Sequence, residues 1–161
     1  MLHYHAGKSR VTSLQRDLRH TESLTVKADL SKESEARRAF EQAIRRFGRI
    51  DALVANAGSW ETREVPLNKM TVSQWRQTME GVATTTFFTV REFLRLVKRQ
   101  KRGNLTLIAS TAAVFGEAGH SDYAAAKAAI AYGLTRSLKN ELVKLAPHTQ
   151  HYCGGDRKSV V

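Results

Sequence analysis

The 161-residue sequence is poor in cysteine, with Cys153 alone, and in proline, with two. A single cysteine excludes a disulfide framework and a cysteine-based metal site, so we expect a reducing, cytoplasmic environment. No apolar run is long enough to cross a bilayer, and the opening residues MLHYHAGKSR turn polar too early for a signal peptide. These absences leave a soluble globular domain, long enough to bury a core, as the predicted class.

Acidic residues are also scarce: 15 Asp and Glu face 26 Lys and Arg, for a formal net charge of +11. Such a balance raises the possibility of a nucleic-acid or membrane partner. The basic residues, however, are spread over the polar faces of predicted helices, as at Arg37, Arg45, Arg95 and Lys98. That pattern favours solvated faces. We therefore predict no nucleic-acid and no membrane partner, whereas an anionic nucleotide would suit the charge.

Along the chain, segments whose apolar residues have the spacing of a strand alternate with segments whose apolar residues have the spacing of a helix. The clearest helix is 31–48, with Ser31 as a candidate N-cap and Gly48 just past its end. Thr71 and Gln74 fit a capping box at the start of a second long helix. The other predicted elements are strands at 1–5, 23–29, 50–56 and 104–110 and helices at 9–20, 71–99 and 122–145. This order predicts an α/β fold with a parallel sheet.

In an open parallel sheet, ligands bind beyond the carboxyl ends of the strands. Polar or very small residues follow all four predicted strands, and Tyr123 and Lys127 begin the helix after the last one. Four residues apart, this phenol and ammonium share one helix face, which is common on ordinary solvated helices. Their convergence with the four strand ends favours a functional role. The strand ends are 5–10, 29–30, 56–58 and Ser110.

Four short stretches in this order resemble the short-chain dehydrogenase/reductase family. They are ADL at 28–30, ANAG at 55–58, LIAS at 107–110 and YAAAK at 123–127, and the thirteen-residue step from Ser110 to Tyr123 is also similar. The resemblance covers roughly residues 1–147. It implies a Rossmann-like doubly wound sheet and an NAD(P)-dependent oxidoreductase that reduces a ketone or oxidises a secondary alcohol.

The resemblance also implies the roles of three residues. Tyr123 would donate the proton to the carbonyl oxygen, and Ser110 would hydrogen-bond that oxygen as charge develops on it. A free phenol titrates near pH 10, so the nearby Lys127 ammonium would lower the pKa of Tyr123. Lys127 would in addition hold the nicotinamide ribose.

The end of the first predicted strand bears on cofactor choice. The sequence contains no acidic residue before Asp17. NAD-binding sites usually have a carboxylate at this position, which binds the hydroxyls of the adenosine ribose. The donors present instead suit a 2′-phosphate, which favours NADP(H) over NAD(H); they are His5, Lys8, Ser9 and Arg10. By resemblance, five further residues would border the cofactor, Asp29 by accepting from the adenine amino group; they are Asp29, Leu30, Asn56, Ala57 and Gly58.

The sequence departs from the family pattern in three places. Val82 or Ala83 stands where the long helix would carry an asparagine, so Thr84 or Thr85 would have to serve its proton relay. No glycine-rich phosphate turn is present, and the central strand that precedes it would be missing, leaving a gap between strands 1–5 and 50–56. After a partial domain at 1–147, we expect residues 148–161 to be a non-native or disordered tail without the family's last strands.

These departures predict that the chain is an inactive fragment of an oxidoreductase with negligible affinity for NADP(H). In the full-length form, the resemblance implies a homo-oligomer, a dimer or tetramer, assembled through the long helices 71–99 and 122–145. The alternative is a non-enzymatic protein that binds its relatives through the same helices.

Overall fold

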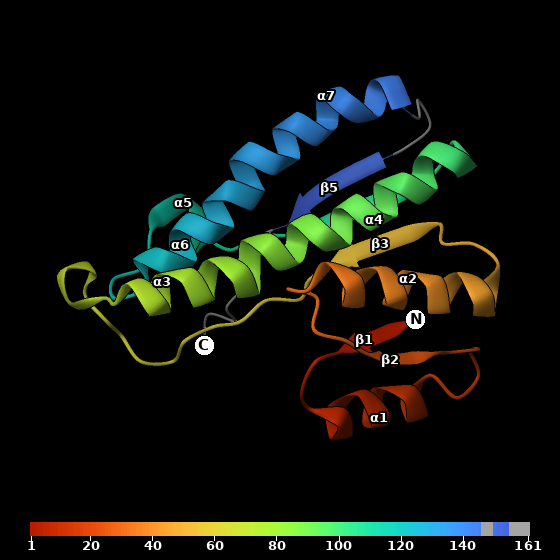
Figure 1. Ribbon diagram of the computed structural model, residues 1–161, viewed down its shortest axis with the longest axis horizontal. Helices are drawn as coiled ribbons and strands as arrows, with labels where there is room; N and C mark the ends of the chain where they lie inside the picture. The colour runs from red at the N-terminus through yellow and green to blue at the C-terminus, as the bar shows by residue number, and fades with distance from the viewer. Residues whose placement is uncertain (146–149, 155–161) are drawn as a thin grey trace.

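The computed structural model describes residues 1–145 and 150–154 and confirms the predicted alternation of strands and helices (Figure 1). The first half comprises β1 (Leu2–Tyr4), α1 (Lys8–Asp17), β2 (Thr25–Lys27), α2 (Glu33–Phe47) and β3 (Ala52–Ala55). The second comprises η1 (Leu67–Lys69), α3 (Val72–Met79), η2 (Glu80–Thr84), α4 (Thr85–Gln100), β4 (Asn104–Ile108), α5 (Ala112–Phe115), α6 (Ser121–Ala128), η3 (Ala129–Leu134), α7 (Thr135–Leu145) and β5 (Gln150–Gly154).

The strands pair in parallel but form two separate sheets. One sheet has the order β1-β2 and the other β3-β4-β5, with Leu2 opposite Thr25 and Ala52 opposite Asn104. β1 and β3 are not hydrogen-bonded to each other, which confirms the predicted gap in the sheet. The fold is therefore an incomplete Rossmann-like α/β sheet.

A cavity of about 540 Å³ fills this gap, and we call it the interstrand slot. Its lining includes the facing edges of β1 and β3. α2 and α1 supply further apolar side chains to the lining, among them Phe40, Ala43 and Leu14. Val54, in the middle of β3, is 61% exposed, although a valine in the centre of a parallel sheet is normally buried on both faces.

The apolar core is divided by the same gap. The larger cluster lies between β3, β4 and the long helices and contains the fully buried Phe93, Leu105 and Leu107. The smaller cluster joins β2 to the start of α2 through Val26 and Ala36. α2 also packs against α4. Each sheet thus has its own core, and the slot separates the two.

Helix capping agrees with the sequence at two of three positions. Gly48 ends α2 with a φ of 75°, a left-handed conformation that glycine adopts without strain. The Thr71 hydroxyl oxygen accepts from the Gln74 backbone amide at 3.1 Å, which is one of the two hydrogen bonds of the predicted capping box. The prediction for Ser31 is wrong: Lys32 is the N-cap residue of α2, because the Ser31 hydroxyl donates to Asp29 instead.

Both long helices contain a π turn that the sequence analysis did not predict. η2 separates α3 from α4, and η3 separates α6 from α7. A threonine closes each turn by donating to the carbonyl five residues earlier: Thr85 to Glu80 at 3.1 Å and Thr135 to Ile130 at 2.8 Å. The backbone amide of each threonine donates to the same carbonyl, so the hydroxyl adds a second hydrogen bond to the one that closes the π turn.

β5 lies in the segment for which we expected a tail without a strand. Gln150–Gly154 pairs in parallel with β4, with Gln150 opposite Asn104 and Gly154 opposite Ile108. β4 offers an unpaired edge on the side away from β3, and such an edge is a template for any extended segment. The rest of the expected tail lies outside the described residues.

Candidate active site

The end of β4 and the first turns of α6 place the three predicted catalytic residues. Lys127 is only 5% exposed, and its Nζ donates to the carbonyl oxygen of Ile108, the last residue of β4, at 2.7 Å. The same Nζ lies 5.8 Å from the centroid of the Tyr123 ring. Ser110 follows two residues after Ile108, and its hydroxyl oxygen accepts from the Ala112 amide at 3.3 Å. The strand end thus holds the ammonium beside the phenol.

Tyr123 packs against Trp60, which in turn packs against His120, and the sequence analysis singled out neither Trp60 nor His120. Trp60 meets the Tyr123 ring edge-on at 4.5 Å between centroids and lies 4.1 Å from the His120 ring. Trp60 sits two residues beyond the ANAG turn, and this short distance from a strand end is the signal that could have found it. The stack limits the orientation of the phenol ring.

The start of α6 is anchored by a buried carboxylate. Asp122 is 1% exposed, and its Oδ2 accepts from the Thr78 hydroxyl at 2.6 Å and from the Gln74 side-chain amide at 3.4 Å. Its Oδ1 accepts from the Tyr123 amide at 2.9 Å. Asp122 therefore ties α3 to the residue that carries the phenol, and it takes the Gln74 side chain that a complete capping box would have used.

A hollow of about 1140 Å³ opens at the carboxyl ends of β1, β2 and β3, and we call it the rim hollow. Eight of the nine additional residues predicted to bind cofactor line it: His5, Ser9, Arg10, Asp29, Leu30, Asn56, Ala57 and Gly58. Lys8, the ninth, is exposed and outside the lining. Three of the four predicted strand ends thus border one hollow, and Ser110 at the fourth is not among the residues that line it.

Gly58 lines the rim hollow and lies next to Lys127. A Cβ atom at Gly58 would lie 4.0 Å from the Lys127 Nζ and 3.8 Å from a Val82 methyl group. Gly81 also lines the hollow, and a Cβ there would lie 2.4 Å from the Ser59 hydroxyl oxygen. A side chain at Gly81 would therefore have to displace Ser59 in the turn after β3, whereas a methyl group at Gly58 would make ordinary contacts with Val82 and Lys127.

Of Val82 and Ala83, the two residues that stand where an asparagine was expected, Val82 is completely buried and Ala83 half-buried. Of the two threonines suggested as substitutes, Thr85 is 6% exposed and its hydroxyl proton is directed to the Glu80 carbonyl. Thr85 does line the rim hollow, so its oxygen can still accept a hydrogen bond there. A relay through this threonine would use the hydroxyl as an acceptor.

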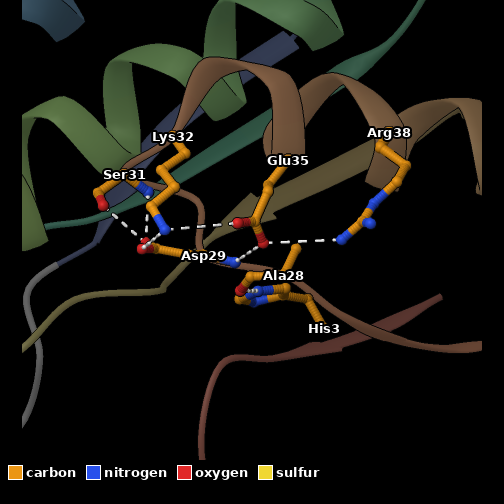
Figure 2. Close-up of polar contacts among 7 residues, drawn as sticks. All are labelled: His3, Ala28, Asp29, Ser31, Lys32, Glu35 and Arg38. Carbon is orange, nitrogen blue, oxygen red and sulfur yellow. Dashed lines mark hydrogen bonds and ion pairs between the residues drawn. The ribbon is translucent and has the colours of Figure 1, made fainter.

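Asp29 is held in an ionised state by its neighbours (Figure 2). Its Oδ1 accepts from the Ser31 hydroxyl at 2.6 Å and from the Ser31 amide at 3.1 Å. The Ser31 hydroxyl, followed by the Ser31 amide, His5 and Lys32, lowers the pKa of Asp29 below its ordinary value, and burial opposes the shift only in part. The Asp29 amide donates to Glu35 at 2.8 Å, and this bond lowers the pKa of Glu35 as well.

The substitution Ser31→Ala is expected to raise the pKa of Asp29 towards its ordinary value, because it removes the hydroxyl that contributes most to the shift. A carboxyl group with a lowered pKa stabilises the fold above its unfolded-state pKa, and this contribution disappears as pH falls through the folded-state value. Side-chain carboxyl NMR during an acid titration measures the change. Ser34→Ala, on the same helix, is the control and should leave the Asp29 titration where it is.

Within the described residues, no helix is long and apolar enough to cross a membrane, and no cluster of three His, Cys, Asp or Glu side chains could hold a metal ion.

Comparison with known proteins places this geometry in a family. The chain is 31% identical over 121 residues to a 3-oxoacyl-[acyl-carrier-protein] reductase of Synechocystis, which covers 75% of the chain and 48% of the reductase. It is 34% identical over 116 residues to an acetoacetyl-CoA reductase of Acinetobacter. This alignment covers 72% of the present chain and 46% of the Acinetobacter reductase. The chain therefore spans about half the length of these curated relatives.

A solved structure has the same fold. The NADH-dependent reductase A1-R′, responsible for alginate metabolism, superposes with a TM-score of 0.84 at 21% identity, covering 94% of this chain and 63% of the reductase. A family model for short chain dehydrogenases matches residues 2–147, which are nearly the whole described chain. The chain belongs to the short-chain dehydrogenase/reductase family.

Proposed function

We propose that the site performs NADP(H)-dependent reduction of a ketone, or the reverse oxidation of a secondary alcohol, when the fold around it is complete. The observation that supports this most directly is the Lys127 ammonium, buried at the end of β4 and 5.8 Å from the centroid of the Tyr123 ring. A buried cation favours the phenolate form of a neighbouring tyrosine, which eases proton transfer near neutral pH.

Each residue has a defined role in this mechanism, and Lys127 would also hold the nicotinamide ribose. Tyr123 gives its proton to the carbonyl oxygen, Ser110 hydrogen-bonds that oxygen, and Lys127 stabilises the phenolate that remains. A nicotinamide cofactor bound in the rim hollow would supply hydride. Asn56, Ala57 and Gly58 would border that cofactor, and Asp29 and Leu30 would hold its adenine end. Gly58 leaves the space between them and Lys127 open.

A preference for NADP(H) is supported by the start of α1. Ser9 and Arg10 line the rim hollow, and no acid is present in the first turn of this helix. Arg10 offers a planar pair of donors that suits a phosphate, and the positive end of the helix dipole adds to the attraction. His5 lies at the same edge, whereas Lys8 would contribute from outside the hollow.

The experiment is a chimera in which residues 2–147 of this chain replace the corresponding segment of the Synechocystis reductase. With acetoacetyl-CoA as substrate, we expect oxidation of NADPH, followed by its absorbance, and a lower rate with NADH. The variant Arg10→Ala should raise the KM for NADPH much more than that for NADH. A chimera with a cooperative thermal transition and no turnover with either cofactor would contradict the proposal.

A second candidate function is binding to relatives without catalysis, through the long helices. Trp75, Phe87 and Tyr132 lie on these helices and are 38%, 46% and 41% exposed, so both helices present aromatic surface. The same surface could assemble a homo-oligomer of the complete enzyme. Sedimentation of the chain with and without the Synechocystis reductase distinguishes the two: self-association supports the oligomer, and a mixed complex supports the binding protein.

A further inference from the structure

A groove between α2 and α4 lies apart from the proposed active site, and we call it the helix groove. Its cavity of about 430 Å³ is within the size range of pockets that bind small molecules. Within the described part of the chain, no residue lines both the helix groove and the rim hollow. α2 and α4 pack against each other and run in the same direction, from left to right in Figure 1. The two helices thus form the walls of a separate groove of ligand size.

The walls of the helix groove come from one stripe of residues on each helix. On both helices the lining residues lie three or four positions apart, as Phe40 and Ile44 do on α2, which places them on one helix face. Phe40 is buried, and Ile44 and Leu96 are half-buried. Arg45 and Arg99, in contrast, are exposed. The groove therefore has an apolar floor and a charged rim.

Two arginines on the rim of the groove have no acidic partner. The other two, Arg37 and Arg95, each pair with a glutamate on their own helix. Among the described residues, no carboxylate lies within ion-pair distance of Arg45 or Arg99. Both arginines belong to the last turns of their parallel helices, so they lie at the same end of the groove. That end therefore carries two cations without a counter-charge beside an apolar floor.

The end of the groove fits a carboxylate that is attached to an apolar chain. A guanidinium offers paired donors in a planar fork that matches the geometry of a carboxylate. The chain would leave water for the surface of Phe40, Ile44 and Leu96, which is favourable in proportion to the apolar area that it covers. Two carboxylates, Glu41 and Glu92, line the same groove, so a head group with a second negative charge would be repelled.

We propose that the helix groove binds an amphipathic monocarboxylate, with its head group on Arg45 and Arg99 and its chain along the floor between the two helices. Such a ligand would neutralise both arginines and cover the apolar floor at the same time. The site uses none of the residues proposed for catalysis, so its test does not depend on the proposed function.

The probe is octanoate, titrated into the purified 161-residue chain and followed by calorimetry, and we expect saturable one-to-one binding. Acetate keeps the head group without the chain, and octyltrimethylammonium keeps the chain with the opposite charge, so both should bind at least tenfold more weakly. Octyl phosphate, whose head group carries more than one negative charge near neutral pH, should also bind more weakly than octanoate. In an NMR titration, octanoate should shift the side-chain Nε–H signals of Arg45 and Arg99 and leave that of Arg46 in place.

Two pairs of chain variants test the location. Arg45→Gln and Arg99→Gln should each lower the affinity for octanoate at least tenfold, because each removes one side of the carboxylate site. Arg46→Gln and Lys98→Gln are the controls: these neighbours lie outside the lining, and the variants should bind octanoate as the parent does. All four side chains are exposed, so the variants should fold as the parent does, which circular dichroism checks.

The proposal would be overturned by equal affinity for octanoate and octyltrimethylammonium, or by equal losses in an arginine variant and its neighbouring control. Unshifted Arg45 and Arg99 signals in the presence of octanoate would have the same consequence, and this result does not depend on the folding of any variant. Octyl phosphate that binds more tightly than octanoate would also contradict a site for a monocarboxylate.

Discussion

Replacing Tyr123 with phenylalanine is expected to lower the turnover of the chimeric reductase by about 10²–10⁴-fold, the usual contribution of a positioned general acid. The ring would keep its edge-on contact with Trp60, so the local packing should be preserved. Only the hydroxyl that would protonate the substrate oxygen is lost. Stopped-flow measurement of NADPH oxidation gives the rate.

Tyr132→Phe is the matched control for this substitution. Tyr132 belongs to η3 on the same long helix and is 41% exposed, so loss of its hydroxyl should leave turnover within about twofold of the parent, the range expected of a surface change. NADPH binding, measured by fluorescence, should be equal in both variants. Turnover that survives in Tyr123→Phe would remove this residue from the proposed mechanism.

Replacing Phe93 with alanine is expected to lower the free energy of unfolding by about 3–5 kcal/mol, the cost of a large cavity in a packed core. Phe93 is completely buried in the larger cluster, between α4 and β4. Its ring also approaches Gly103, where a Cβ would lie 3.0 Å from Cζ, so the turn before β4 fits closely against it. Urea unfolding followed by circular dichroism measures the change.

Phe87→Ala removes the same ring from the same helix at a position that is 46% exposed. It contacts the Arg91 guanidinium, 5.0 Å from the ring centroid, and the Phe88 ring, 5.3 Å between centroids. We expect a loss of about 1 kcal/mol or less, in the range of an exposed cation–π contact. Equal losses in the two variants would mean that the core of this chain is not packed as described.

The sequence predicted those features that depend on short periodic patterns. Apolar residues recur at helical spacing along α2, and the structure buries Ala36, Phe40 and Ala43 and half-buries Ile44 and Phe47. The meeting of Asp29 with Asn56 at one rim also followed from the pattern, because parallel strands end at the same edge.

The sequence did not predict features in which one group can choose between several hydrogen-bond partners. Ser31 could cap α2 or bond Asp29, and nothing in the spacing shows that the carboxylate is nearer. β5 depends on the open edge of β4 and not on a strand pattern of its own. The π turns did leave a signal: Gly81 and Gly133 interrupt otherwise helical runs, and a threonine follows each within four residues.

The π turn η2 adds one residue to a helix in which eighteen residues would otherwise complete five turns. From Thr78 to Val97 is nineteen steps, which in an uninterrupted α-helix would place the two side chains about 100° apart around the axis. The inserted residue absorbs that angle, so Thr78 can reach Asp122 while Val97 enters the core. η2 therefore rotates α4 relative to α3 about the helix axis. As a result, Thr78 at the site and Val97 in the core lie on the same side of the helix.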